Sequence, residues 1–424
     1  MLLLNNRQLI GILSDVLGCV DSRLIDHGKR VAYIMFKILQ DMPRFDDYEL
    51  RNICIAALLH DIGAYKTEEI DKMLSFETID IWEHSIYGAL FLKYFSPIKE
   101  LLPIVMFHHA ECKEIPAMDP TLKMLAQLIS LADRAEICLK SGKTMKDFRE
   151  YLQKYRGNRH CDEIVDMFLE SGVDIDTVFD GMEKDKGFSA VLFDMPMTSQ
   201  EIDDYINMIV HLIDFRSNQT VIHTVTTACI ACFLGRIYGA NNEEISQLRT
   251  GAMLHDLGKI STPLNILESP NRLTEDEMEI MRMHVVVSEE ILSAHIGEPI
   301  KGIAVKHHEK LTGDGYPKGL SGDELTLWER IAIVADIFGA LYGSRTYKEA
   351  YPKEKCVAIL QKMSDDGLID AGIVAAVIRH YDEICAAVEE EAEPVIEAYE
   401  AIKADYARLV ANPSLTKFYG CVTA

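Results

Sequence analysis

The sequence predicts an all-α protein with two tandem copies of one helical domain and a C-terminal helical tail. Apolar residues recur at helical spacing, as in LRNICIAALLHDIGAY (Leu50–Tyr65) and ISQLRTGAMLHDLGKI (Ile245–Ile260), and no convincing alternating strand pattern occurs. Helix starts are marked by Thr or Asn followed three residues later by Glu, which is the spacing of a capping box. Three such pairs begin at Thr198, Asn241 and Thr274.

The same motifs occur twice, in the same order and with nearly the same gaps. ICIAALLHDIGAY in the first half resembles QLRTGAMLHDLGKI in the second, and IVMFHHAE resembles IAVKHHEK. The first two histidines of the series are 33 residues apart in the first half (His27 to His60) and 32 apart in the second (His223 to His255). Two copies of one domain explain this agreement, whereas chance does not.

These repeats set the expected domain boundaries. We place copy one at residues 1–172, a linker at 173–197, copy two at 198–385 and the tail at 386–424. The tail is an acidic amphipathic helix, which we expect to be interrupted near Pro394.

Composition excludes several classes of function. The 424 residues carry a formal net charge of −24, which argues against binding of long nucleic acid through a basic surface. No apolar run reaches the length of a membrane span, and the start of the chain lacks a convincing secretory signal, so we expect a cytoplasmic protein that does not bind membranes. The ten cysteines are then expected to be reduced thiols, and the CxxC pair Cys229 and Cys232 is best interpreted as core packing.

Each copy contains five histidines and two aspartates at matching positions. In copy two they are His223, His255, His284, His307 and His308 with Asp256 and Asp336; in copy one they are His27, His60, His84, His108 and His109 with Asp61 and Asp133. Seven such ligands exceed the needs of one ion, and Asp256 could bridge two. Ligands of nitrogen and oxygen without thiolate suit iron, manganese, nickel or zinc. A pair of close metal ions is suited to the hydrolysis of phosphate esters.

The alternative interpretation is that these side chains are core histidines or helix caps. It is the better interpretation for single residues such as His160, His295 and His380. It fails for the set, because Asp256 and Asp336 lie in apolar helices and would be costly to bury without a counter-charge. We therefore expect two divalent ions in copy two and a further metal site in copy one.

Copy two resembles a known family. His223, HDLGK from His255 onward, His284, the pair at His307, Gly-Tyr-Pro at residues 315–317, and Asp336 are similar to the HD-GYP branch of HD-domain phosphohydrolases over roughly Ile222–Tyr351. Copy one resembles a plainer HD domain. The resemblance implies an all-helical domain with a bi- or trinuclear centre, typically of iron or manganese. It also implies phosphodiesterase action on bacterial cyclic dinucleotides, usually cyclic di-GMP and in some tandem members cyclic GMP-AMP.

The resemblance also implies roles for individual residues. The seven His and Asp residues of copy two would be metal ligands, and Asp256 and Lys259 would serve catalysis, with Lys259 beside the scissile phosphate rather than a surface lysine at a helix end. Tyr316 would line the substrate pocket, in a loop that Gly313 allows to turn sharply. Arg345 and Lys348 would contact phosphate, although Thr346 stands where the family usually has proline.

Departures from the family pattern refine these expectations. Gln219 and Gly339 stand where trinuclear members have acidic ligands, which predicts a two-metal centre and a linear dinucleotide product. In copy one, Ala64 replaces the counterpart of Lys259, and no Gly-Tyr-Pro loop follows the paired histidines. Copy one is then a metal-bound structural or regulatory domain, a hydrolase of another phosphate compound, or a degenerate copy that packs against the other; we favour the first.

The function that follows is a phosphodiesterase in which metal-bound hydroxide attacks a cyclic dinucleotide, either cyclic di-GMP or 3′,3′-cyclic GMP-AMP. One alternative is an HD phosphohydrolase that acts on another nucleotide or an alarmone. A second is a receptor that binds the dinucleotide without turnover. A homodimer is compatible with the sequence, which does not decide between the two dinucleotides.

Overall fold

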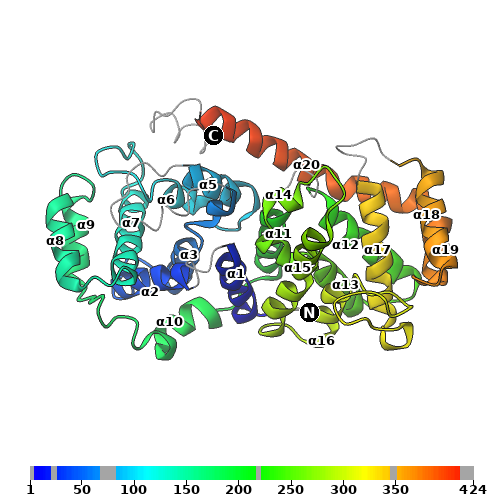
Figure 1. Cartoon of the computed structure of the whole chain (residues 1–424). Helices are drawn as coiled ribbons and strands as arrows, with labels where there is room; N and C mark the ends of the chain where they lie inside the picture. Colours follow the sequence, from blue (N-terminus) through cyan, green and yellow to red (C-terminus); the bar gives the residue numbers. More distant parts are fainter. Residues whose placement is uncertain (1–3, 21–25, 67–82, 216–220, 344–350, 411–424) are drawn as a thin grey trace. The chain divides into compact units, whose positions relative to one another are not determined.

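The structure is a computed structural model that describes residues 4–20, 26–66, 83–215, 221–343 and 351–410. Every regular element in these ranges is a helix, and the only β-type pairings among them are two isolated bridges (Figure 1). The predicted all-α fold is confirmed. None of the described helices is both long and apolar enough to cross a membrane.

The chain divides into two compact units. The N-terminal unit comprises residues 5–205 and 401–424, and the C-terminal unit comprises residues 1–4 and 206–400. Helices α11 (Ser199–Asp214) and α20 (Tyr381–Val410) contribute residues to both units.

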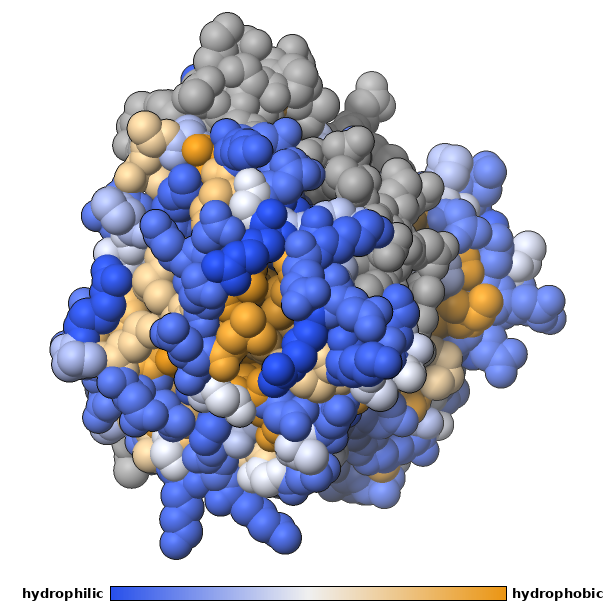
Figure 2. Space-filling view, turned by 90° about the vertical axis from the view of Figure 1, so that its left-hand side faces the viewer, coloured by the Kyte–Doolittle hydropathy of each residue, from blue (hydrophilic) through white to orange (hydrophobic). Residues whose placement is uncertain are grey.

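The N-terminal unit is built around α7, a long helix that carries fifteen consecutive buried residues from Met124 to Cys138. It begins at a cap in which the Asp119 carboxylate accepts hydrogen bonds from the backbone of Thr121 and Leu122. The elements before α11 are α1 (Asn6–Val20), α2 (His27–Leu39), α3 (Asp47–Leu58), η2 (Ile62–Lys66), α5 (Glu83–Phe95), η3 (Lys99–Leu101), α6 (Leu102–Met106), α7 (Pro120–Lys140), α8 (Met145–Tyr155), α9 (Asp162–Glu170), η4 (Met182–Lys184), α10 (Lys186–Ser189) and η5 (Ala190–Asp194). On the side of α8 and α9, mostly hydrophilic residues surround a smaller hydrophobic area (Figure 2).

The segment 173–197, expected to be a linker, is partly helical and belongs to the N-terminal unit. It contains η4, α10 and η5. The ring of Phe188 lies 4.9 Å from that of Tyr33 and 5.4 Å from that of Phe36, and Arg7 pairs with Asp194 at 2.7 Å. Aromatic packing therefore ties this segment to α2.

The C-terminal unit repeats the order of helices that carries the histidines. After α11 its elements are α12 (His223–Ile237), α13 (Asn242–Met253), η6 (Leu257–Ser261), α14 (Leu264–Leu267), α15 (Glu275–Ser293), α16 (Glu298–Val305), η7 (Gly322–Glu324), α17 (Leu327–Gly343), α18 (Lys353–Asp365), α19 (Ala371–Arg379) and α20. The predicted capping boxes at Asn241 and Thr274 are present, and Thr198 exchanges the same pair of hydrogen bonds with Glu201.

The predicted interruption of the tail helix near Pro394 is wrong, because α20 continues through this residue. Proline removes one backbone hydrogen bond, but Pro394 lies on the exposed side of the helix. The turns on either side are held by buried Val388, Ala392 and Tyr399. Tertiary packing thus overrides the local preference of proline.

The prediction that all cysteines are reduced is wrong for one pair, because Cys112 and Cys161 form a disulfide. Two backbone contacts bring them together. The Cys112 N–H donates to the carbonyl of Arg159, and the Cys161 N–H donates to the side-chain oxygen of Gln127. Cys229 and Cys232 are buried thiols, as expected from their place in an apolar helix.

Candidate metal centres

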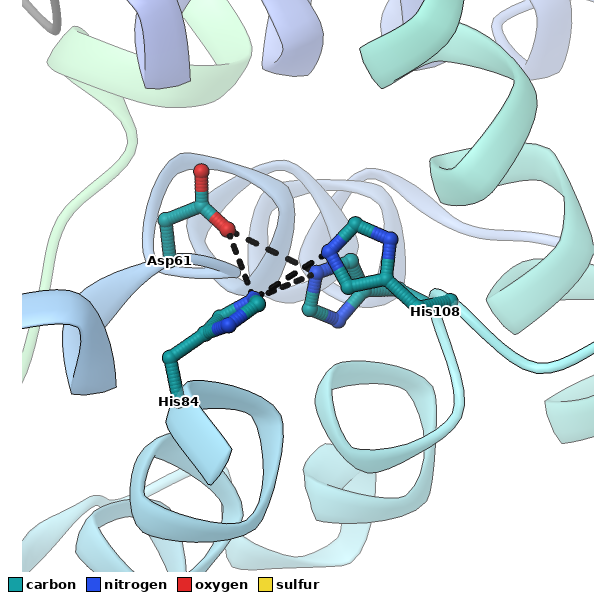
Figure 3. A group of neighbouring side chains, drawn as sticks. Asp61, His84 and His108 are labelled. Atoms are coloured by element: carbon teal, nitrogen blue, oxygen red, sulfur yellow. Dashed lines mark hydrogen bonds and ion pairs between the residues drawn. The ribbon is translucent and has the colours of Figure 1, made fainter. Parts of the chain in front are cut away.

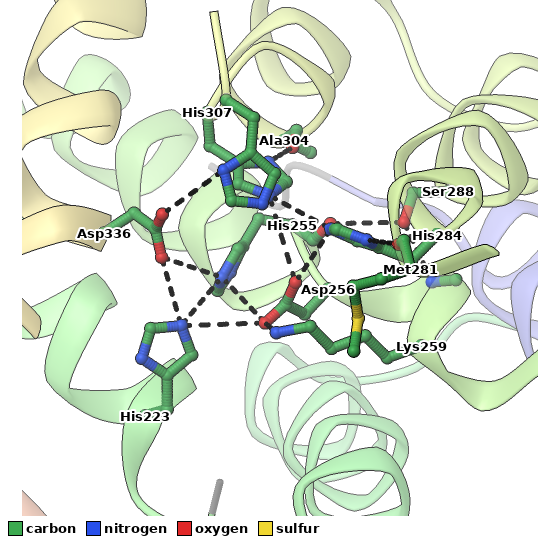
Figure 4. Close-up of polar contacts among 12 residues, drawn as sticks. His223, His255, Asp256, Lys259, Met281, His284, Ser288, Ala304, His307 and Asp336 are labelled. Atoms are coloured by element: carbon green, nitrogen blue, oxygen red, sulfur yellow. Dashed lines mark hydrogen bonds and ion pairs between the residues drawn. The ribbon is translucent and has the colours of Figure 1, made fainter. Parts of the chain in front are cut away.

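The seven predicted ligands of copy two come from five segments and meet in one cluster, of which Figure 4 labels all but His308. His223 is the first residue of α12, and Asp336 lies within α17. His255 and Asp256 lie between α13 and η6, His284 lies within α15, and the pair His307–His308 follows α16. The C-terminal unit therefore brings together all the metal ligands expected in it.

Asp256 stands between two groups of histidines. Its Oδ2 lies 3.1 Å from Nε2 of His255 and 3.6 Å from Nε2 of His223. Its Oδ1 lies 3.4 Å from Nε2 of His284 and 3.9 Å from Nε2 of His307. Each carboxylate oxygen thus faces a different pair of imidazoles, an arrangement suited to two ions bridged by one aspartate.

Asp336 completes both groups. Its Oδ1 lies 3.1 Å from Nε2 of His223 and 3.6 Å from Nε2 of His255, while its Oδ2 lies 3.8 Å from Nδ1 of His308. The donor set of imidazole nitrogens and carboxylate oxygens fits iron, manganese, zinc or nickel.

Backbone contacts orient three of the imidazoles. The Nδ1–H of His255, of His284 and of His307 each donates to the carbonyl of the residue three positions earlier, at 2.7, 2.5 and 2.6 Å. In the neutral imidazole this bond leaves Nε2 without a proton and directed at the cluster, as in histidines that bind metal ions. The acceptors are Ala252, Met281 and Ala304, of which Figure 4 labels the last two.

The charge states also suit a cation. Burial opposes ionisation of Asp256, yet His255 and Lys259 hold its pKa well below the usual range. Burial lowers the pKa of His284 to about 4 and that of His308 to about 4, so both imidazoles are neutral near pH 7. At His255 burial lowers the pKa, but Asp256 and Asp336 raise it to about 10. A positive charge, whether a proton or a metal ion, is therefore favoured between His255 and the carboxylates.

Lys259 lies in η6 and forms an ion pair with Oδ2 of Asp256 at 2.5 Å. The turn that carries it packs tightly on α15, since a Cβ added to Gly258 would come within 1.9 Å of the carbonyl oxygen of His284. The Gly258 N–H donates to the hydroxyl of Ser288 at 2.8 Å. The glycine of HDLGK thus lets the Asp256 turn approach the helix of His284.

The Gly-Tyr-Pro loop places Tyr316 against the cluster. The Tyr316 ring lies 4.7 Å from that of His308 at an interplanar angle of 32°, and the Tyr316 N–H donates to the His308 carbonyl. Gly315 has no room for a side chain, because a Cβ would lie 2.5 Å from Cα of Glu309, and Gly313 has a φ of +79°. Arg345, Lys348, Thr346 and Gln219, on which other expectations rest, lie outside the described residues.

Copy one gathers its seven predicted ligands in the same way. Figure 3 shows three of them, Asp61, His84 and His108. Oδ1 of Asp61 lies 3.4 Å from Nε2 of His84 and 3.5 Å from Nε2 of His108. Its Oδ2 lies 3.2 Å from Nε2 of His60 and 3.5 Å from Nε2 of His27. The last two ligands adjoin these groups: Asp133 Oδ1 lies 3.4 Å from His27 Nε2, and His109 Nε2 lies 3.1 Å from His84 Nε2.

Comparison with known proteins identifies both units. Models described as "HD domain" match residues 24–137 and 207–373, which enclose the two clusters. The chain belongs to the HD-domain family. The resemblance drawn from the motifs is thereby confirmed, with two HD domains in tandem.

Curated relatives extend the match. The chain is 26% identical over 398 residues to the 3′3′-cGAMP-specific phosphodiesterase 1 of Vibrio cholerae, covering 89% of this chain and 92% of the relative. It is 34% identical over 186 residues to the cyclic di-GMP phosphodiesterase response regulator RpfG of Xanthomonas campestris, of which it spans 49%. A crystal structure titled as a cyclic GMP-AMP specific phosphodiesterase of V. cholerae (V-cGAP3) shares the fold, with a TM-score of 0.55 and 17% identity over 91% of this chain and 98% of that one.

Three buried charged residues of the HD domains were not predicted. In the first domain, Nδ1 of His27 bonds Glu136 at 2.7 Å, and Arg134 pairs with Oδ2 of Asp133 at 2.9 Å. Arg134 and Glu136 both follow Asp133 in the motif series. Because Glu136 is three residues after Asp133, as Gly339 is after Asp336, aligning the two copies could have drawn attention to Glu136. In the second domain, Asp214 is 2% exposed and accepts a hydrogen bond from Thr224 at 2.8 Å, and burial raises its pKa to about 7. It lies nine residues before His223 and outside any motif.

Gly339 bears on the number of ions in the second HD domain. A Cβ at this position would lie 2.9 Å from the hydroxyl oxygen of Thr227, so an acidic side chain there would require Thr227 on α12 to shift. This close packing is consistent with the expectation of two ions.

A cavity of about 660 Å³ lies next to the second cluster, beside Ile222 and Tyr342. Its remaining lining comes from α20 and includes four carboxylates: Glu389, Glu390, Glu393 and Glu397. Such a surface repels phosphate, so we do not assign the dinucleotide to it.

Proposed function

We propose that the second HD domain is a metal-dependent phosphodiesterase that hydrolyses cyclic di-GMP or 3′,3′-cyclic GMP-AMP to a linear dinucleotide. The observation that carries the proposal is the position of Asp256, whose two oxygens face two histidine pairs beside Lys259. The names of the relatives support the class of substrate.

The residues of the domain form two adjacent sets of ligands. We assign one ion to His223, His255, Asp336 and Oδ2 of Asp256, and the other to His284, His307, His308 and Oδ1 of Asp256. Iron or manganese are the expected metals, with nickel or zinc as alternatives. When bound, two such ions would activate water and offset the charge of the phosphate.

Protein groups around the ligands handle the substrate. The ammonium of Lys259 lies one hydrogen bond from the bridging carboxylate, where it can donate to a phosphate oxygen and stabilise charge that develops on it. Tyr316 forms a wall beside His308, and burial raises the pKa of its phenol, which keeps it neutral near pH 7. The 3′ oxygen of a ribose would leave as the ring opens.

We assign the first HD domain a structural or regulatory role with bound metal. Ala64 is buried at the position that corresponds to Lys259, so this cluster has no ammonium group beside its bridging aspartate from that position. Arg134 faces Asp133, but it is 1% exposed and is poorly placed to meet a substrate.

Product analysis tests the proposal. Purified, metal-loaded protein would be offered cyclic di-GMP and cyclic GMP-AMP together, with metal content measured on the same sample. We expect a linear dinucleotide from at least one of them and about two ions bound in the second domain. Tight binding of a dinucleotide without any product would favour a receptor, and hydrolysis of other nucleotides alone would favour another HD phosphohydrolase.

A further inference from the structure

Arg282 lies beside the wall of the second cluster, although no motif includes it. It is an exposed residue of α15, two positions before His284. Its guanidinium carbon lies 5.3 Å from the centroid of the Tyr316 ring, which in turn lies 4.7 Å from the ring of His308. Arg282, Tyr316 and His308 thus form a series of contacts from the surface to the metal ligands.

Four cations on neighbouring segments have carboxylate partners, whereas Arg282 and Arg272 form no ion pair among the described residues. In the part of the chain that the structure describes, Arg282 forms no ion pair, although Glu279 lies one turn earlier on the same helix. The paired cations and their N–O distances are Lys306 with Glu329 (2.7 Å), Lys310 with Asp314 (3.1 Å), Lys318 with Glu289 (2.6 Å) and Arg330 with Asp370 (3.1 Å). The positive charge of Arg282 is therefore available to a ligand.

The substrate class requires such a charge. A cyclic dinucleotide contains two phosphodiesters in one ring, and only one of them can lie at the metal ligands during cleavage. The other must be held by a protein with a net charge of −24, whose general field repels it. Guanidinium is well suited to this task, because its planar N–H groups can donate two parallel hydrogen bonds to phosphate oxygens.

We propose that Arg282 binds the second phosphodiester of the cyclic dinucleotide, the one that is not cleaved. This rests on the proposed function of the second HD domain. The ring of Tyr316 holds the guanidinium by a cation–π contact at the edge of the site. Arg282 is thus a substrate-positioning residue for a two-phosphate ring, which a diester with a single phosphate does not need.

The test compares Arg282→Gln with wild type on two substrates. For cyclic di-GMP we expect KM to rise about tenfold with kcat changed by less than about threefold, since the lost contact binds ground state and transition state alike. Bis(p-nitrophenyl) phosphate has one phosphate. For this substrate we expect the loss of kcat/KM to be at least about fivefold smaller than the loss for cyclic di-GMP. Arg282→Lys keeps the charge and should recover part of the loss.

Arg272→Gln is the matched control. Arg272 is also exposed, and its replacement by glutamine removes the same charge. It precedes α15 and is not in the proposed site. A KM for cyclic di-GMP in Arg282→Gln within about twofold of the Arg272→Gln value would overturn the proposal. So would a loss confined to cyclic di-GMP or to cyclic GMP-AMP, because the two rings share the second phosphodiester and differ only in a base.

Binding separates this proposal from the proposed function. The affinity of metal-loaded wild type and Arg282→Gln for a non-hydrolysable phosphorothioate analogue of cyclic di-GMP would be measured by calorimetry. A roughly tenfold weaker affinity of the variant supports the role of Arg282 even if no turnover is seen. If wild type hydrolyses the dinucleotide but wild type and Arg282→Gln bind the analogue with equal affinity, only the proposed role of Arg282 is contradicted. If wild type neither binds nor hydrolyses the dinucleotide, both proposals fail.

Discussion

The two HD domains hold nearly the same ligands in different surroundings. In both, one aspartate divides its oxygens between two pairs of histidines, and a second aspartate adjoins the first pair. The second domain adds Lys259 and Tyr316 next to this arrangement. The first domain instead has Ala64 and a buried Glu136. We therefore expect metal binding and handling of a dinucleotide to be separate properties, encoded by different residues.

The exposure of matching ligands differs in both directions. The side chain of His223 is 13% exposed, whereas that of His27, its counterpart, is 3% exposed. His308 in the second domain is 28% exposed, which leaves one imidazole of the second ion site open to a ligand. The bridging aspartates differ the other way, since the side chain of Asp61 is 14% exposed and that of Asp256 is 4% exposed, so the exposure of the ligands does not rank the two clusters.

Apart from replacement of a metal ligand, replacement of Lys259 should cause the largest loss of activity. Lys259→Met should lower kcat on the cyclic dinucleotide by about 10²-fold with metal content retained, because it removes a charge directed at the phosphate. The reciprocal Ala64→Lys should not create activity in the first domain, which has no Gly-Tyr-Pro loop. Steady-state kinetics with metal analysis measure both. A fall of less than about fivefold in Lys259→Met would contradict the assigned role.

Glu136 should distinguish the two domains by metal affinity. Its carboxylate accepts from Nδ1 of His27 and is supported by Arg30 at 3.3 Å. Loss of such a partner of a metal-binding histidine typically costs about 10- to 100-fold in affinity, so Glu136→Gln should release metal from the first domain at lower chelator concentration. Dinucleotide hydrolysis should be unaffected. Glu163→Gln, an exposed change in the same domain, is the control; identical release by both variants would show that Glu136 has no such role.

The smallest effect concerns the pH dependence of stability. Burial lowers the pKa of His160 in the first domain to about 3, below its value of about 6.5 in an unfolded chain. Below pH 6.5 the unfolded chain therefore takes up the proton first, and stability falls as the pH falls. Between pH 7 and pH 5 this group should remove about 2 kcal/mol from the unfolding free energy of the domain. In His160→Gln, the fall of the unfolding free energy between pH 7 and pH 5 should be smaller by that amount, as measured by calorimetry. An unchanged fall would show that the low pKa of His160 does not contribute to this pH dependence.

Sequence reasoning predicted which side chains gather in each domain better than it predicted their surroundings. The spacing of the fourteen positions could be recognised because it occurs twice in the sequence, and most of the histidines lie at a turn or a helix end. Glu136 was missed because its contact with His27 joins residues 109 positions apart. Asp214 was missed because it lies outside any motif. Arg134 pairs with the adjacent Asp133, and nothing in the repeat pattern marks it.

The two errors have the same physical origin. The Cys112–Cys161 disulfide depends on the approach of two loops 49 residues apart, which no local pattern encodes. The continuity of α20 through Pro394 depends on buried residues on both sides of the proline. In each case tertiary contacts outweigh the local preference from which the prediction was made.

Replacement of the two bridging aspartates tests the central claim most directly. Turnover of the cyclic dinucleotide and metal content would be measured for Asp61→Ala and Asp256→Ala on the same samples. We predict that both variants lose metal, but that only Asp256→Ala loses activity, by at least about 1,000-fold. Asp61→Ala should stay within about threefold of wild type, because it shares no partner with the second cluster. Loss of hydrolysis in Asp61→Ala with retention in Asp256→Ala would contradict the account.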